Sequence, residues 1–187
     1  MASSAPAPPS APDVARVPLN RTPKPGYELD ALRTVTLTPI GVIESPYQWR
    51  DEAPRQATVG APAEATIVLR RGLQNTLKDL IGFEYCWVLY WFNYSHGWRQ
   101  QVVPPRDKVK RGLFATRSPD RPNPIGLSAV RIVSIRGVRI VVRGVDMLNG
   151  TPVLDIKPYV PAYDAFPGAK AGWVDGLAEP GPDHRWE

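Results

Sequence analysis

A proline-rich stretch near the middle of the chain holds its densest group of polar side chains. Residues 113–126 read LFATRSPDRPNPIG, so three prolines fix the backbone φ angle at nearby positions. A loop stiffened in this way loses less conformational entropy on ordering, and it can hold Arg117, Arg121 and Asn123 in set directions. The pattern suits a rigid binding loop. It also suits a stiff corner of the fold whose arginines are only surface charges.

A second polar stretch, residues 146–161, reads DMLNGTPVLDIKPYVP. Its Asn-Gly pair predicts a turn. Four polar residues follow at spacings of two or four on a strand-like run: Thr151, Asp155, Lys157 and Tyr159. Alternate residues of a strand point to the same side, so these four are expected to share one face. Alternatively, Asp155 and Lys157 form only an exposed ion pair of small energetic value.

Positive charge is concentrated between residues 99 and 121. The whole chain has a formal net charge of +5, and this segment alone holds seven cations and two acids. The cations are Arg99, Arg106, Lys108, Lys110, Arg111, Arg117 and Arg121. Such a cluster is typical of a surface that binds phosphate-rich partners, and a solvated basic loop is the alternative.

Several common catalytic patterns are absent from the sequence. It has no G-x-G-x-x-G, G-x-x-x-x-G-K-[ST], H-E-x-x-H or G-x-S-x-G, so dinucleotide enzymes, P-loop NTPases, zinc peptidases and α/β-hydrolases lose support. His96 could act as a general base, although a loop histidine is more often a packing or turn residue. Cys86 lies in an apolar run and is expected to be a core side chain. One cysteine and two histidines cannot supply the usual structural zinc ligands, so no metal site is expected.

The elements that must position these residues are predicted to be mainly strands. Apolar runs predict strands at 34–42 with an interruption at Pro39, 65–69, 83–93, 112–116, 125–135, 138–145 and 153–156. The run at 83–93 is apolar throughout, which predicts burial on both faces. Helical spacing of leucines predicts one amphipathic helix over 73–81. The 22 prolines argue against a helical bundle, because proline breaks helices. The expected fold is a compact antiparallel β-barrel with one or two short helices, without alternating βα units.

The composition changes along the chain and suggests three parts. Residues 1–33 are rich in Pro and Ala and are expected to form a disordered or loosely packed tail. Residues 34–166 are expected to form the barrel domain, and residues 167–187 a C-terminal extension. No apolar run is long enough for a membrane-spanning helix, and no signal peptide pattern precedes the first strand. A single cysteine fits the cytoplasm.

Five short motifs in this order resemble the TsaA-like family, whose characterised members are tRNA N6-adenosine methyltransferases of the TrmO type. The motifs are IGVI at 40–43, SPY at 45–47, PRQ at 54–56, GLFATRSPDRPNPIG at 112–126 and NGTPVLDIKPYVP at 149–161. The resemblance covers about residues 36 to 163. It implies a β-barrel without a Rossmann fold that binds S-adenosylmethionine and forms a homodimer. It also implies methylation of N6 of threonylcarbamoyl-adenosine next to the tRNA anticodon.

The resemblance also implies where the cofactor binds. The implied residues are Pro54, Arg55, Gln56, Asn93, Tyr94, Arg117, Leu127, Met147, Leu148, Asn149 and Gly150. Arg117 or Arg55 could hold the cofactor's carboxylate, and Asp146 or backbone carbonyls its ammonium group. Leu127, Met147 and Leu148 could form an apolar wall for the adenine.

Methyl transfer to an adenine amine depends mainly on placing the nucleophile in line with the methyl group. Groups that orient the amine, and later take a proton, would help, and Asp155, Tyr159 and Asn123 are the candidates. The tRNA backbone would follow Arg99, Arg106, Lys108, Lys110, Arg111 and Arg121, with exposed Tyr or Trp rings stacking on a splayed base. Two alternatives stay open: an S-adenosylmethionine enzyme for another RNA or a small molecule, and a non-catalytic RNA-binding or regulatory barrel.

Overall fold

The computed structural model describes residues 34–57, 62–105 and 107–177. Contacts divide the chain into two units, residues 1–36 and 37–187. Residues 34–36 of the first unit form no helix or strand, and the predicted tail at 1–33 lies outside the described residues. All elements discussed below belong to the second unit.

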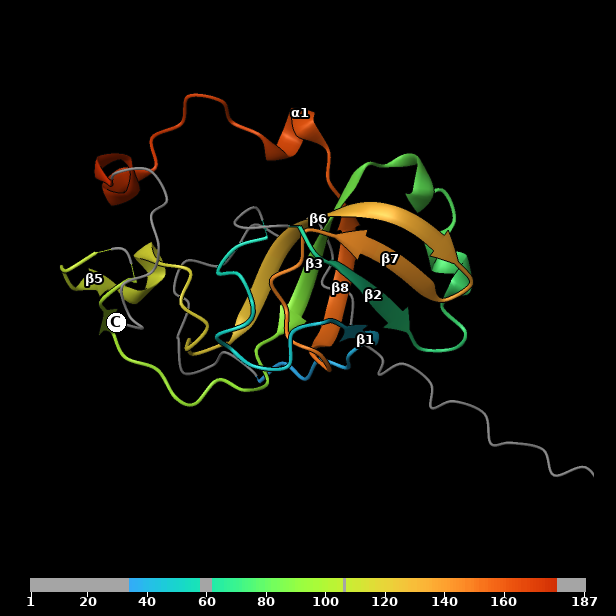
Figure 1. Ribbon diagram of the computed structural model, residues 1–187, viewed down its shortest axis with the longest axis horizontal. Coiled ribbons are helices and arrows are strands. Elements are labelled where there is room, and N and C mark those ends of the chain that lie inside the picture. The colour runs from blue at the N-terminus through green and yellow to red at the C-terminus, as the bar shows by residue number, and fades with distance from the viewer. Residues whose placement is uncertain (1–33, 58–61, 106, 178–187) are drawn as a thin grey trace, which may run out of the picture. The chain divides into compact units, whose positions relative to one another are not determined.

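Six antiparallel strands close into a barrel in the order β1-β2-β7-β6-β3-β8 (Figure 1). They are β1 (Gly41–Glu44), β2 (Glu64–Leu69), β3 (Tyr85–Trp91), β6 (Ile125–Arg136), β7 (Arg139–Arg143) and β8 (Pro152–Pro158). Pairing of β1 with β8 completes the ring. The predicted mainly β, antiparallel barrel is therefore confirmed.

A few short elements lie outside the barrel. Strands β4 (Gln101–Val102) and β5 (Arg111–Gly112) form a separate two-stranded sheet. The helices are η2 (Gln74–Leu77), η3 (Leu80–Gly82), η4 (Leu113–Ala115), α1 (Pro161–Asp164) and η5 (Gly172–Gly176). α1 is the one α-helix among the described residues, and its single turn has no buried residue.

Inward-facing side chains of the strands fill the barrel. Ile43, Ile67, Val88, Val130 and Ile140 have no exposed surface, as expected where every second residue of a strand points inward. Burial of this apolar surface is the main term that stabilises such a fold.

The expectation that strand β3 is buried on both faces is wrong. Cys86, Val88 and Tyr90 point into the core, whereas Trp87 and Leu89 are half-buried on the outer face. The sequence shows no alternation of polar and apolar residues here, because the half-covered outer face of β3 also accepts large apolar side chains. Cys86 is fully buried, and burial raises the pKa of its thiol to about 12, so it is a core side chain as expected.

The predicted helix over 73–81 is also wrong. Lys78 leaves the helical region with ψ 135° and Asp79 lies in the left-handed region at φ 67°, so the segment breaks into the two short helices η2 and η3. Aspartate tolerates this conformation better than most residues, which permits the break. The amphipathic signal itself was real, because Leu77 and Leu80 still pack into the barrel core.

Two predicted strands are shorter than expected. Only Gly41–Glu44 of the first is a strand, and Val35 and Leu37 are exposed. Pro39 lacks an N–H for strand pairing, and it separates these exposed residues from the strand that follows. In the predicted strand at 112–116, only Gly112 is paired, and the following residues form the 3₁₀ helix η4.

Candidate functional site

Three loop segments leave the barrel at the same end. Strand β3 ends at Trp91 opposite Ile125, the first residue of β6. Strand β7 ends at Arg143 opposite Glu64, the first residue of β2. Strand β1 ends at Glu44, and its residue Val42 lies opposite Pro152 at the start of β8. Antiparallel pairing therefore gathers the segments 45–57, 92–124 and 144–151 at one rim of the barrel (Figure 1).

A buried chain of polar groups joins this rim to the barrel wall. The Tyr90 hydroxyl lies 3.2 Å from the Ser128 hydroxyl, and Ser128 donates a hydrogen bond of 2.7 Å to the Asp146 carboxylate. The Ala57 backbone N–H also bonds to Asp146. Asp146 thus connects strand β6 with the loop segments 45–57 and 144–151, and it holds their backbones together.

Burial dominates the electrostatics of this chain. Desolvation raises the pKa of Asp146, although hydrogen bonds from Ser128 and the backbone oppose the rise. Desolvation, reinforced by the Asp146 charge, also raises the pKa of Tyr90. Tyr90 therefore stays neutral.

The raised pKa of Asp146 predicts a pH dependence of stability. Because the folded state holds this proton more tightly than the unfolded state, the free energy of unfolding falls as pH rises above the ordinary carboxylate pKa. The penalty is absent at lower pH and complete above the folded-state pKa. Asp146→Asn is expected to remove this downward contribution, as measured by chemical denaturation of both proteins from about pH 4 to pH 8. Parallel curves for the two proteins would contradict the assignment.

Arg117 bridges two of the rim segments. Its guanidinium donates a hydrogen bond of 2.6 Å to the Gln56 side chain, sixty-one positions away in the sequence. Its positive charge also acts on the Tyr90 hydroxyl and lowers the pKa there, against the larger effect of burial. The structure therefore brings together Gln56, Arg117 and Asp146, three of the predicted cofactor residues.

The turn at 149–150 is fixed on the same rim. The Asn149 side chain accepts a hydrogen bond of 3.1 Å from the Ser45 N–H, and the Asn149 N–H donates to the Tyr47 carbonyl at 2.7 Å. Gly150 has φ 79°, a conformation that favours glycine. These bonds hold the segment 144–151 against residues 45–47.

The other predicted cofactor residues lie around this cluster with different exposures. Asn93 and Tyr94 are exposed just after β3, next to the point where the Phe92 N–H donates to the Pro124 carbonyl at 2.8 Å. Pro54 and Leu148 are half-buried, and Arg55 is exposed. Leu127 is 53% exposed on the outer face, whereas Met147 is 1% exposed in the core. The expected single apolar wall of Leu127, Met147 and Leu148 is therefore not formed by these side chains.

Thr151, Asp155, Lys157 and Tyr159 do not share one face, contrary to the expectation. The pairing of β3 with β8 shifts between Leu89 and Tyr90, so that Leu154 is an extra residue. A bulge of this kind reverses the alternation. Thr151 is therefore buried, while Asp155 and Lys157 lie opposite outward-facing residues of β3 and form an ion pair of 2.7 Å.

The three catalytic candidates are spread over the barrel. Asn123 is exposed on the rim, beside Pro124. The Tyr159 N–H bonds to the Tyr85 carbonyl at the far end of β3, about 20 Å along the strand from Trp91. Asp155 lies between them, opposite Leu89. Within one chain, the structure does not bring Tyr159 to the rim cluster.

The basic segment divides into free and engaged cations. Arg99, Lys108 and Lys110 are exposed, and none forms an ion pair with another described residue. Arg111 pairs with Asp107 at 2.7 Å and lies over the Trp173 ring. Arg121 donates to the Thr116 carbonyl at 2.9 Å and so stiffens the proline-rich loop. Arg106 lies outside the described residues.

Two functional candidates were missed by reasoning from sequence, namely Tyr90 and Ser128. A signal for Ser128 existed, because it is a polar residue at an inward position of the otherwise apolar run IGLSAV. In the described part of the chain, no group of three or more His, Cys, Asp or Glu side chains is placed to hold a metal ion. None of the described helices has the length and apolar character needed to cross a membrane.

Chemically, the rim offers complementary groups. It has a guanidinium, a half-buried carboxylate, several backbone carbonyls and exposed apolar side chains such as Leu127. A ligand that carries a carboxylate, an ammonium group and an aromatic ring would find a partner for each.

Comparisons with known proteins agree with the fold. Residues 42–165 match the family model of the tRNA-methyltransferase O N-terminal domain. A probable S-adenosyl-L-methionine-binding protein of Pyrococcus abyssi is 40% identical over 137 residues, which cover 73% of this chain and 74% of that protein. The tRNA (adenine(37)-N6)-methyltransferase of Escherichia coli is 37% identical over 145 residues, covering 72% of this chain and 62% of that enzyme.

A solved structure gives the same result. The crystal structure of TrmO from Pseudomonas aeruginosa superposes with a TM-score of 0.67 at 34% identity, covering 79% of this chain and 66% of that one. The chain thus spans just under two thirds of the E. coli enzyme and of this solved structure. The matched segment contains the barrel strands except Gly41, the first residue of β1, together with every loop of the rim, and the chain therefore belongs to the tRNA-methyltransferase O N-terminal domain family.

Proposed function

We propose that the protein is an S-adenosylmethionine-dependent methyltransferase that methylates N6 of an adenine in tRNA. The observation that carries this proposal is the rim cluster of Gln56, Arg117 and Asp146, in a chain that is similar to the E. coli tRNA (adenine(37)-N6)-methyltransferase. The specific substrate is threonylcarbamoyl-adenosine next to the anticodon.

The residues of the rim fit the proposed cofactor. Arg117, oriented by Gln56, holds the carboxylate, and Arg55 precedes Gln56 on the loop 45–57. Asp146 already bonds to Ser128 and Ala57, so backbone carbonyls of 146–150 are better placed to accept from the ammonium group. Pro54, Asn93, Tyr94, Leu127 and Leu148 supply the remaining walls, and Met147, Asn149 and Gly150 contribute through their backbone.

Bound S-adenosylmethionine supplies an electrophilic methyl group. The protein's own contribution is then positioning, because the acceptor nitrogen must lie in line with the breaking bond. Asn123, exposed on the rim, orients the adenine amine. Asp155 and Tyr159 lie farther along the outer face, where they could contact tRNA or the acceptor if a second subunit completes the site.

We also propose that the protein is a homodimer in the cytoplasm. The outer face of the barrel exposes a group of large apolar side chains: Tyr85, Trp91, Ile125, Leu127 and Val133. Trp91 pairs with Ile125 and Leu89 with Leu127 across adjacent strands, so much of this apolar surface is contiguous. Contiguous exposed apolar surface supports contact with a second copy.

The test is a methyl-transfer assay with radiolabelled S-adenosylmethionine and tRNA from cells that lack the matching methyltransferase. We expect label in N6-methylated adenosine, and we expect tRNA without the threonylcarbamoyl group to be a poor substrate. Calorimetry with S-adenosylmethionine separates the alternatives. Cofactor binding without label in tRNA would favour another RNA or a small molecule as substrate, and no cofactor binding would favour an RNA-binding or regulatory barrel.

A further inference from the structure

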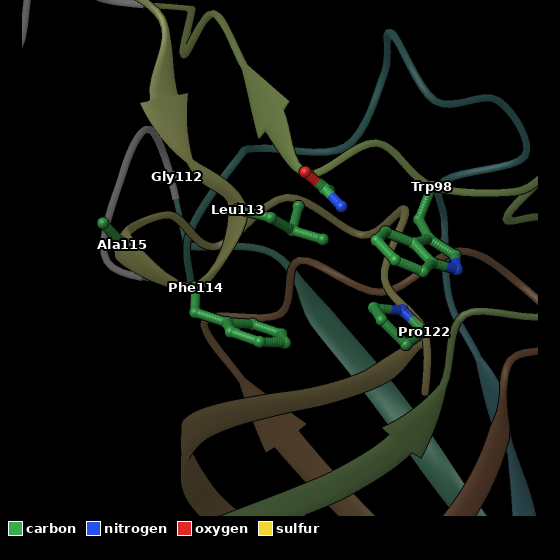
Figure 2. A pocket seen from close by; sticks show the side chains of 7 residues that line it. Trp98, Gly112, Leu113, Phe114, Ala115 and Pro122 are labelled. Carbon is green, nitrogen blue, oxygen red and sulfur yellow. The ribbon is translucent and has the colours of Figure 1, made fainter.

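A hollow of about 390 Å³ lies beside the small sheet of β4 and β5, separate from the polar chain of the rim (Figure 2). Its volume falls in the range of about 300 to 1,000 Å³ that is typical of small-ligand sites. It is lined by Trp98, Gln100, Gly112, Leu113, Phe114, Ala115 and Pro122. These residues come from two segments, 98–100 and 112–122.

The lining of the hollow is aromatic at its sides and buried at its base. In Figure 2 the rings of Trp98 and Pro122 lie next to each other, Leu113 points toward them, and the Phe114 ring lies nearby. Leu113 is 3% exposed, whereas Trp98 is 51% and Phe114 79% exposed. Two largely exposed aromatic rings on either side of a buried leucine mark a surface that is built for a flat apolar ligand.

Positive charge surrounds the hollow. Arg99 lies between Trp98 and Gln100 in the chain and is exposed, and Lys110 is exposed just before β5. Arg121 lies over the Phe114 ring at 5.5 Å while it donates to the Thr116 carbonyl. Arg121 therefore fixes one face of Phe114 and leaves the other available for stacking. A flat ligand with attached negative charge matches these surroundings.

Gln100 adds a polar group that can read the edge of such a ligand. Its backbone carbonyl accepts a hydrogen bond of 2.9 Å from the Leu113 N–H, which ties the two lining segments together. The side-chain amide also lines the hollow and offers one acceptor and two donors. Nucleobases carry both donors and acceptors on their edges.

We propose that this hollow binds one unpaired nucleobase of single-stranded RNA, stacked between Trp98 and Phe114. The inference rests on the proposed function only in taking RNA as the substrate. Phe114 lies in the same loop as Arg117, but the hollow is lined by none of Gln56, Arg117 and Asp146, so we take the stacked base to be a neighbour of the methylated adenosine. The hollow thus selects an unpaired loop as the site of modification.

The test compares Trp98→Ala and Phe114→Ala with Tyr163→Ala, a matched control. Tyr163 is an aromatic residue on α1 that is 75% exposed and does not line the hollow. Fluorescence anisotropy measures affinity for a short labelled single-stranded oligoribonucleotide and for a heparin oligosaccharide, which carries charge without bases. Loss of one stacked base weakens RNA binding by about 5- to 100-fold. We expect this loss in the first two variants only, and unchanged heparin binding in all three.

Separate measurements distinguish failure of this inference from failure of the proposed function. If S-adenosylmethionine binds but Trp98→Ala and Phe114→Ala keep the wild-type RNA affinity, the nucleobase site is wrong and the methyltransferase proposal stands. If methyl transfer to tRNA is absent but both variants lose RNA affinity, the nucleobase site stands alone. A change in oligomeric state of Trp98→Ala by analytical ultracentrifugation would overturn the inference, because a second copy would then fill the hollow.

Discussion

Arg117→Ala is expected to weaken S-adenosylmethionine binding by about 10- to 100-fold, because hydrogen bonds to a charged group contribute about 1.5 to 3 kcal/mol. The side chain is exposed and bonds to Gln56 on another loop, so its removal takes away a ligand for the cofactor's carboxylate without opening the core. The free energy of unfolding should change by less than about 0.5 kcal/mol. Calorimetric titration together with chemical denaturation measures both quantities.

Arg136→Ala provides the matched control for this prediction. Arg136 is another exposed arginine, but it lies at the end of β6, more than ten residues along the strand from the rim. Its loss lowers the net charge by the same amount, so a general electrostatic effect would weaken cofactor binding equally in both variants. Equal affinities of the wild type and Arg117→Ala would remove Arg117 from the site.

Gln56→Ala refines the role of Arg117. If Gln56 acts by orienting the guanidinium, its removal should weaken binding less than Arg117→Ala, and the double variant should resemble Arg117→Ala alone. Additive losses would instead show that Gln56 contacts the cofactor independently.

The barrel could be predicted from the sequence because its signals are local. Two apolar runs on either side of Arg136-Gly137 predict the hairpin over 125–145, and the structure pairs Arg136 with Arg139 there. Strand ends were less predictable, since the break at Asp79 depends on one backbone angle that no periodicity reports. Closure of the sheet through β1 and β8 depends on residues more than a hundred positions apart.

Parts of the candidate site could not be predicted for the same reason. The bulge at Leu154 reverses the faces of β8, so simple alternation placed Thr151 beside Asp155, and the barrel separates them. The hydrogen bond between Gln56 and Arg117 joins loops that no sequence pattern pairs. The sequence motifs nevertheless overlapped all three loop segments of the rim, at 45–47 and 54–56, at 112–126 and at 149–161, although Asp146 lies outside them.

Gly126→Ala is expected to destabilise the protein by about 2 to 3 kcal/mol, as overpacking does in a well-filled core. A Cβ atom at position 126 would overlap the ring of Tyr90. The ring cannot move aside easily, because Tyr90 is 3% exposed, packs edge-on against Phe92 at 5.1 Å and lies 3.2 Å from the Ser128 hydroxyl. Displacing it would also disturb Ser128 and Asp146, so S-adenosylmethionine affinity should fall together with stability.

A rescue variant distinguishes this overlap from an ordinary loss of glycine. In a Tyr90→Leu background the ring is absent, so Gly126→Ala should lower the free energy of unfolding much less than it does in the wild type. The double variant should therefore be more stable than the sum of the two single losses predicts. Gly82→Ala is the control, because a Cβ atom there meets nothing within 4 Å. The prediction would be wrong if Gly126→Ala lowered the free energy of unfolding equally in both backgrounds. The Tyr90 ring would then not be what restricts position 126.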